Sequence, residues 1–211
     1  MATDNILKLL LDTPTPYLTS SYLIDLFKEY KSPQHKIKLL LANADLIHIK
    51  QGLYILGEKY NKKYSKTVIS GMIFGPSAIS FEYALYEHGL IPERAETVTC
   101  LCFKRNKAFK TPIGLFTYKY IRKDLYPIGI SYKETELGNY FLATPEKALC
   151  DLAYHQNLKT TDEAFEYINT DLRIDADSIN KFDLSLLMKI SKIYNNKSVH
   201  NLVGGINESR Y

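Results

Sequence analysis

A group of polar residues at the start of one expected helix has the residue types and spacing that suit contacts with nucleic acid. Ser32 followed by Pro33 marks the start of this helix, because a serine hydroxyl can cap a helix and proline is accepted in its first turn. If Ile37 faces the core, the polar residues around it point outward or lie at the edge of the buried stripe. Glutamine pairs with adenine, whereas lysines and the free N–H groups of a first turn suit phosphate. We therefore predict DNA contacts from Ser32, Gln34, His35, Lys36 and Lys38.

A second group of contacts is predicted at the tip of a β-hairpin. Two apolar-rich runs, 46–49 and 53–56, flank the turn Lys50-Gln51-Gly52, in which glycine suits the left-handed position. Lys50 at the tip suits a phosphate, and Gln51 lies beside it. The placement of charge agrees, since residues 1–66 hold 10 lysines against 6 acidic residues and residues 67–211 hold 17 of each sign.

Further basic residues, in a run that extends to residue 123, form a possible secondary contact with nucleic acid. They could extend the footprint along DNA or contact RNA. The alternative is an exposed strand edge that lysines protect from aggregation. The first residues of the run are Lys104, Arg105, Lys107 and Lys110.

No catalytic or metal-binding constellation stands out. Cys100 and Cys102 lack a second pair of zinc ligands, and we interpret them, with Cys150, as packing residues. Asp175 and Asp177 have the spacing of a metal-binding acid pair, but no glycine-serine turn precedes them, so a helix start is the ordinary explanation. The sequence has no GxSxG, P-loop or GxGxxG motif. We expect no catalytic residue, metal, cofactor or enzymatic activity.

The elements expected to position the first group are three helices and the hairpin, which together have the winged helix-turn-helix layout. The helices are expected over 4–12, from Thr19 or Ser20 to residue 30, and over 33–44. The polar, lysine-rich residues 58–66 suit a linker. We therefore predict a winged-helix DNA-binding domain over 1–60 and a second domain over 67–211.

The second domain is expected to be α+β, with a small antiparallel sheet flanked by helices. Its predicted helices cover 66–74, a segment from Ser77 or Ser80 to residue 89, 145–155 after a Thr144 cap, 162–168 and 184–194. Its predicted strands cover 97–103, 109–110, 114–121 and 129–132. Residues 199–211 are expected to be a loosely held tail.

Composition indicates a folded protein, with 45% apolar and 24% charged residues among 211. No apolar run is long enough to cross a bilayer, and the start lacks the features of a signal peptide. The three cysteines have no disulfide-framework spacing. We expect a cytoplasmic protein with no membrane partner.

Three segments resemble the AbiEi antitoxins, the transcriptional regulators of AbiE (type IV) toxin–antitoxin systems that act in abortive infection, a form of phage defence. The hairpin residues 46–54, LIHIKQGLY, are similar to the wing of this family. Residues 79–92, ISFEYALYEHGLIP, and 143–154, ATPEKALCDLAY, are similar to two segments of its second domain. The matches follow the family order over about residues 3–155. Gln51 stands where many relatives carry arginine or lysine.

The resemblance implies an N-terminal winged helix that binds inverted repeats in its own promoter as an autorepressor. It also implies a C-terminal antitoxin domain that counteracts a nucleotidyltransferase toxin encoded alongside, without a tight stable complex. Two alternatives remain open. One is a winged-helix regulator whose C-terminal domain senses a ligand or protein, with no toxin partner. The other is a nuclease or transferase carried by a DNA-binding domain.

Overall fold

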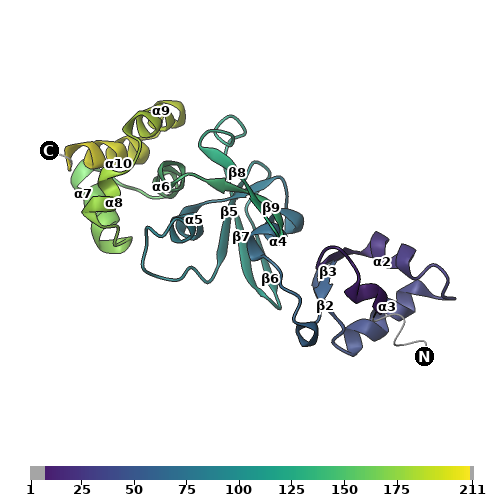
Figure 1. Ribbon diagram of the computed structural model, residues 1–211. Helices are drawn as coiled ribbons and strands as arrows, with labels where there is room; N and C mark the ends of the chain where they lie inside the picture. Colours follow the sequence, from purple (N-terminus) through teal and green to yellow (C-terminus); the bar gives the residue numbers. More distant parts are fainter. Residues whose placement is uncertain (1–7, 210–211) are drawn as a thin grey trace.

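The computed structural model describes residues 8–209 and has an α+β fold, which begins with a small three-stranded antiparallel sheet and its helices (Figure 1). Residues 8–11 are helical, and the first part of the helix predicted over 4–12 lies outside the described residues. The strands are ordered β1-β3-β2. In chain order the elements are β1 (Tyr17–Thr19), α2 (Ser20–Leu26), α3 (Pro33–Ala42), β2 (Leu46–Lys50) and β3 (Leu53–Leu56).

Local signals explain where these elements begin and turn. Thr19 caps α2 as predicted, since its hydroxyl accepts from the Tyr22 N–H at 3.2 Å. Ser32 and Pro33 begin α3 as predicted, but the Ser32 hydroxyl makes no cap hydrogen bond within the described structure. The backbone at Ser32 has ψ 88°, whereas the capping residue Thr19 has ψ 158°. Ser32 therefore precedes α3 as predicted, but its hydroxyl does not cap the helix, and that part of the prediction is wrong. The hairpin turn holds Gly52 at φ 82°, in the left-handed region that favours glycine.

The small sheet is buried on both of its faces. One face packs under α2 and α3 in a cluster that includes Leu18, Leu46 and Leu56. The other face contributes to the large core of the molecule. Its buried members are Tyr17, Ile49, Leu53 and Ile55. The sheet is therefore a shared layer between the N-terminal helices and the rest of the chain.

The larger sheet is mixed, which corrects the prediction of a small antiparallel sheet in this region. Its order is β6-β7-β5-β4-β9-β8, with β5 parallel to β7 and β4 parallel to β9. The strands β4 and β9 were not predicted from the sequence, and of the two predicted starts for the next helix, Ser80 is the one observed. The strands are β4 (Ser77–Ile79), β5 (Val98–Cys102), β6 (Lys107–Thr111), β7 (Gly114–Tyr120), β8 (Ile130–Thr135) and β9 (Gly138–Ala143).

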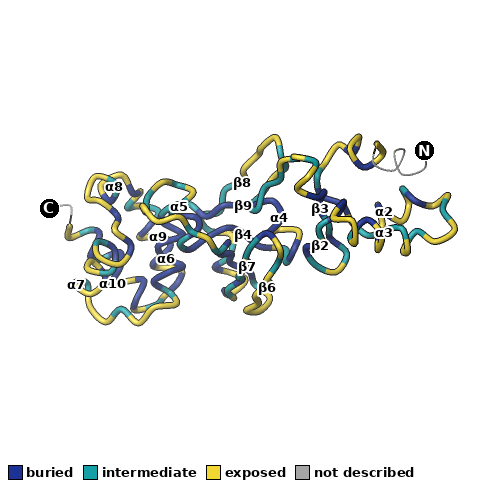
Figure 2. The backbone as a smooth tube through the Cα atoms, turned by 90° about the horizontal axis from the view of Figure 1, so that it is seen from below, coloured by how far each residue is buried: buried dark blue, intermediate teal, exposed yellow. Residues whose placement is uncertain are grey.

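Helices cover both sides of this sheet. The helix α4 lies between the mixed sheet and the small sheet, whereas α5 and α6 lie on the opposite side (Figure 1). Figure 2 shows β4 and α6 running through the buried interior. As predicted, the Thr144 hydroxyl caps α6 and Pro145 begins it. The bounds are α4 (Lys66–Ile73), α5 (Phe81–Glu87) and α6 (Pro145–Tyr154).

The C-terminal region packs as helices beyond α6, and the prediction of a loose tail over 199–211 is wrong for its described part. The helix α10 buries Val199, Leu202 and Ile206, and it contacts α7 and α9. A Cβ on Gly205 would come within 2.8 Å of the Thr161 carbonyl oxygen, so the glycine permits close packing on α7. The elements are α7 (Thr161–Glu166), a π-helical turn (Tyr167–Asp171), α8 (Ala176–Asn180), α9 (Leu184–Tyr194) and α10 (Lys197–Glu208).

The polar segment between the small sheet and α4 is held at several points. A short 3-10 helix, Glu58–Tyr60, follows β3. The Lys59 ammonium lies 2.7 Å from the buried Asp45 carboxylate. The Ser65 N–H donates to the Tyr17 hydroxyl at 2.9 Å. The segment expected to be a linker therefore follows a fixed path along the small sheet.

No helix in the described part of the chain is both long and apolar enough to cross a membrane.

Candidate nucleic-acid interface

The exposed side of α3 borders a groove that also takes in α2 and the hairpin. Ile37 and Leu40 turn toward the core, while Gln34, His35 and Lys38 are exposed. The groove has a volume of about 330 Å³. Its lining residues are Ser20, Ile24, Gln34, Ile37, Lys38, Leu41, His48 and Tyr54.

The structure separates the residues predicted on α3 into two directions. Gln34 and Lys38, one helical turn apart, both line the groove. Lys36 is half-buried, and its ammonium lies 5.2 Å from the centre of the Tyr30 ring. His35 and Ser32, whose hydroxyl makes no cap hydrogen bond, are exposed near the start of the helix. The residues therefore follow the first two turns of α3, with Gln34 and Lys38 facing the hairpin.

Sequence reasoning missed three residues that the hairpin and α2 add to this groove. His48 and Tyr54 are cross-strand partners whose rings lie 5.2 Å apart. The Ser20 hydroxyl donates to the Tyr54 hydroxyl at 3.3 Å. The register of β2 is regular from Leu46 to His48 and shifts only between His48 and Lys50, so alternation places His48 on the same face as Leu46.

Lys50 and Gln51 occupy the hairpin tip in different ways. Gln51 is exposed. The Lys50 ammonium donates to the Ile73 carbonyl at 2.5 Å, at the C-terminal end of α4, where the helix dipole favours a cation. Partial burial lowers the pKa of Lys50, and the nearby charge of Lys104 lowers it further. A phosphate contact by Lys50 would require its ammonium to leave the α4 carbonyl.

The secondary basic residues lie on the sheet edge next to the hairpin. They are all exposed, on β6 or in the turn before it, and β6 contacts β2. The Lys104 ammonium donates to the Gly75 carbonyl at 2.5 Å and lies 5.3 Å from the centre of the Phe74 ring. The fold therefore brings Lys104, Arg105, Lys107 and Lys110 to the side of the molecule where the hairpin meets α4.

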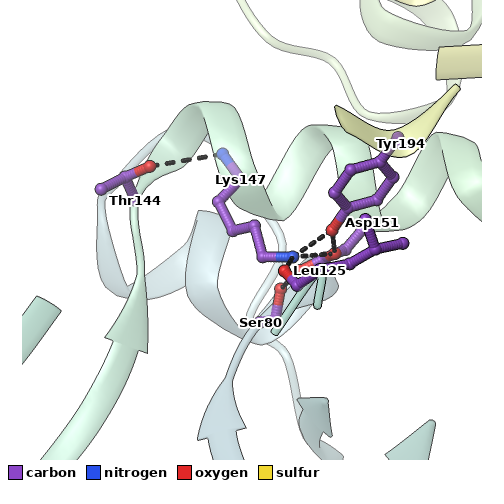
Figure 3. Close-up of polar contacts among 6 residues, drawn as sticks. All are labelled: Ser80, Leu125, Thr144, Lys147, Asp151 and Tyr194. Atoms are coloured by element: carbon purple, nitrogen blue, oxygen red, sulfur yellow. Dashed lines mark hydrogen bonds and ion pairs between the residues drawn. The ribbon is translucent and has the colours of Figure 1, made fainter. Parts of the chain in front are cut away.

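A buried polar cluster holds the segment 143–154 in place (Figure 3). The Lys147 ammonium and the Asp151 carboxylate are 2.8 Å apart, and both side chains have no exposed surface. The Ser80 hydroxyl donates to Asp151 at 2.6 Å, and the Leu125 carbonyl accepts from Lys147 at 3.1 Å. The Tyr194 hydroxyl completes the cluster through hydrogen bonds with Asp151 and Lys147.

This cluster has the groups of an acid–base site but lacks access for a substrate. Every charge in it is paired, and the side chains come from α6, α9 and the corner between β4 and α5. It therefore joins the mixed sheet to the C-terminal helices. The sequence signal for it is the spacing of Lys147 and Asp151, which lie four residues apart on one helix.

The other residues considered for chemistry have structural surroundings. Cys100, Cys102 and Cys150 are free and buried, and burial raises the pKa of the Cys100 thiol to about 12. The Asp175 carboxylate caps α8 by accepting from the Ser178 N–H at 2.8 Å. Within residues 8–209, no group of three or more histidine, cysteine, aspartate or glutamate side chains could hold a metal ion.

The chain is similar in fold to a solved structure from Mycobacterium tuberculosis, the crystal structure of the RV2827C protein. The superposition has a TM-score of 0.57 at 12% sequence identity, and it covers 100% of this chain and 81% of the other. At that identity the likeness extends to the fold alone. No protein-family model matches the chain, and no curated protein matches its sequence.

Proposed function

We propose that this protein is a winged-helix DNA-binding autorepressor and the antitoxin of an AbiE-like toxin–antitoxin system. The observation that carries the DNA-binding part is the exposed side of α3, where Gln34 and Lys38 border a groove closed by the β2–β3 hairpin. A helix presented this way can enter the major groove with its early residues at the base edges.

The topology of the small sheet supports this proposal. The order of elements, a helical segment, β1, α2, α3 and then a hairpin whose second strand pairs with β1, agrees with the layout expected of a winged helix. In that layout α2 and α3 form the helix-turn-helix, and the β2–β3 hairpin is the wing. The exposed N-terminal turn of α3 adds Ser32 and His35 as groups within reach of a phosphate or a base.

The proposed footprint has a centre and a flank. At the centre, Gln34 reads a base edge while Lys38 and Lys36 contact phosphates. At the flank, Gln51 lies at the tip of the β2–β3 hairpin, and the exposed β6 residues lie on the strand that contacts β2. A duplex that follows the wing would therefore pass them. Base readout by a single bidentate pair is worth about 1–3 kcal/mol of discrimination.

The test for DNA binding measures the affinity of the full chain for the inverted repeats upstream of its own reading frame, over a range of salt concentrations. The double variant K36E/K38E is compared with K189E/K192E, which makes the same change of charge at exposed positions of α9. Each lost phosphate contact should reduce the salt slope by about 0.9. If K36E/K38E and the unaltered chain bound DNA with equal affinity, α3 would not be part of the DNA interface.

The antitoxin part rests on the sequence resemblance of residues 79–92 and 143–154, and it has a separate test. The full chain is co-expressed with the nucleotidyltransferase-class protein encoded next to it, and growth is followed. We expect K36E/K38E to lose repression yet still restore growth, because both substitutions lie outside the proposed antitoxin domain, residues 67–211. The absence of an adjacent nucleotidyltransferase reading frame, or failure of the unaltered chain to restore growth, would contradict this role.

A further inference from the structure

A hollow lies between α4, the loop that leads from α4 to β4, and the β8–β9 hairpin (Figure 1). Its volume is about 230 Å³. A protein cavity of about 150 Å³ holds a benzene molecule, so this hollow has room for one substituted aromatic ring or for two fused rings. It shares no lining residue with the α3 groove.

The Ser77 side chain is directed from the mixed sheet toward α4. Ile79 pairs with Cys100, and Cys100 pairs with Tyr118, so these three side chains share one face of the sheet. The Tyr118 hydroxyl donates to the Ser70 carbonyl of α4 at 2.6 Å, so this face is the one that α4 covers. Ser77 lies two residues before Ile79 in β4 and therefore has the same direction. Ser77 also lines the hollow.

The Ser77 hydroxyl is buried and has no hydrogen-bond partner among the described residues. The residue is only 6% exposed. A buried hydroxyl without a hydrogen bond is unfavourable, and such groups are normally satisfied. The Ser70 hydroxyl, which belongs to the same lining, shows the usual case, because it donates to the Thr67 carbonyl at 2.7 Å. Since a serine hydroxyl can both donate and accept, one hydrogen-bonding group on a ligand would satisfy Ser77.

The lining of the hollow favours a ligand without charge. Among the described residues, no aspartate, glutamate, lysine, arginine or histidine lines it. An ion that entered would lose hydration without gaining a counter-charge, which is strongly unfavourable. Val68 and Met72 of α4 add apolar surface that a neutral ligand can cover.

Aromatic residues of the β8–β9 hairpin form one wall of the hollow. Tyr140 lies on the α4 side of the sheet, because it is two residues before Leu142, which pairs with Ile79. Tyr132 and Phe141 pair across the hairpin with ring centres 5.5 Å apart. They are 54% and 45% exposed, so they belong to the outer part of the lining. A wall of rings favours an aromatic ligand, through stacked or edge-to-face contacts.

We propose that this hollow binds a small, uncharged aromatic molecule with one hydrogen-bonding group, such as a phenol or an indole. The polar group of the ligand bonds to the Ser77 hydroxyl, and its ring lies against the apolar and aromatic lining. A ring without a polar group leaves Ser77 unsatisfied, and a charged ring finds no counter-charge. The site does not depend on DNA binding, because the hollow and the α3 groove are lined by different residues.

The experiment measures binding of single-ring and fused-ring probes to the full chain by calorimetry and ligand-observed NMR. The candidate ligands are p-cresol and indole. Toluene lacks the polar group of p-cresol, whereas p-toluate and p-methylbenzylamine carry a negative and a positive charge. We expect saturable binding of p-cresol or indole, and binding of the other three that is weaker by about fivefold or more. No saturable binding by p-cresol and indole, or equal binding by toluene or a charged probe, would overturn the proposal.

The variants S77A and S70A compare the two serine hydroxyls of the lining. S77A removes the hydroxyl without a partner, so the melting temperature of the unliganded protein should stay the same or rise. S70A removes a hydroxyl that is bonded within α4, so the melting temperature should fall. We expect S77A to weaken binding of the tighter ligand about fivefold or more, and S70A to change it by less than about twofold. Unchanged ligand binding by S77A, or a fall in its melting temperature as large as that of S70A, would overturn the proposal.

Gly71 provides a test by filling the hollow. It lines the hollow, and a Cβ at this position would have no other atom within 4 Å. G71L therefore adds bulk where the fold has space, and S185L is the control at an exposed position of α9 outside the hollow. We expect G71L to weaken ligand binding about tenfold or more and S185L to leave it unchanged. Unchanged binding by G71L, or an equal loss by S185L, would contradict binding in this hollow.

Discussion

Replacing Asp151 by alanine should destabilise the protein strongly, because it leaves a buried cation without its counter-charge. Lys147 and Asp151 have no exposed side-chain surface, and Asp151 also accepts from Ser80 and Tyr194. Removing one partner of a buried ion pair costs about 3–5 kcal/mol. For a protein of this size that corresponds to a fall in melting temperature of about 6–20 °C.

Urea unfolding of the full chain, followed by circular dichroism, measures this cost. The double variant K147M/D151L should lose less than D151A, because it removes both charges and leaves apolar side chains of similar size. The control D25A breaks the exposed Lys28–Asp25 contact at 3.9 Å and should cost less than about 1 kcal/mol. A loss for D151A no larger than that for D25A would refute the reasoning that the buried charge is uncompensated.

Three further predictions concern other parts of the molecule. G205A should cost about 1–3 kcal/mol in urea unfolding, because its Cβ meets Thr161, whereas G71A on α4 meets open space and should be neutral or stabilising; equal effects would contradict the packing of α10 on α7. Burial and the charge of Lys119 lower the pKa of His155 in the folded protein, so its contribution to stability should be complete above pH about 6.5 and decline as the pH falls below that value. The variant H155Q should show a smaller loss of stability between pH 7.5 and 5.5, and an unchanged pH slope would exclude His155 as its source. None of the three cysteines should react with a thiol reagent until the protein unfolds, and rapid modification of the native protein would show that a thiol is accessible.

Elements with strong local signals could be predicted from the sequence. Neighbouring residues determine three such features: the Thr19 cap, the glycine of the β2–β3 turn, and the Thr144–Pro145 start of α6. The helix over 184–194 was also predicted with its observed bounds. In each case the hydrogen bonds and apolar spacing that define the element lie within one or two turns of chain.

The parts that could not be predicted depend on contacts between distant residues. The pairing of Ile79 with Leu142 makes β4 and β9 parallel, and no local pattern indicates that partnership. The segment 199–209 looks weak alone because of its two glycines, yet those glycines let α10 approach α7 closely. Tertiary contacts therefore convert an apparent tail into a buried helix.

The candidate interface shows the same division. The exposed position of Lys38 follows from helical periodicity around Ile37, whereas the same periodicity placed Gln34 near the edge of the buried stripe. His48 was missed because its place in the groove depends on its cross-strand partner Tyr54 and on the packing of the hairpin beside α3, which involve residues distant in the sequence. The engagement of Lys50 with α4 was missed because it depends on how the hairpin meets the rest of the chain.

The small sheet with two covered faces also limits how the protein can be divided. A fragment that ends at residue 66 would carry Tyr17, Ile49, Leu53 and Ile55 without the core that buries them. Those four side chains would form one solvent-exposed hydrophobic patch, and the fragment would tend to self-associate through it. The N-terminal part is thus not an independent unit that could be moved to another protein. Its three-stranded sheet packs against the remainder of the molecule, and this packing sets the orientation of α3 relative to that remainder.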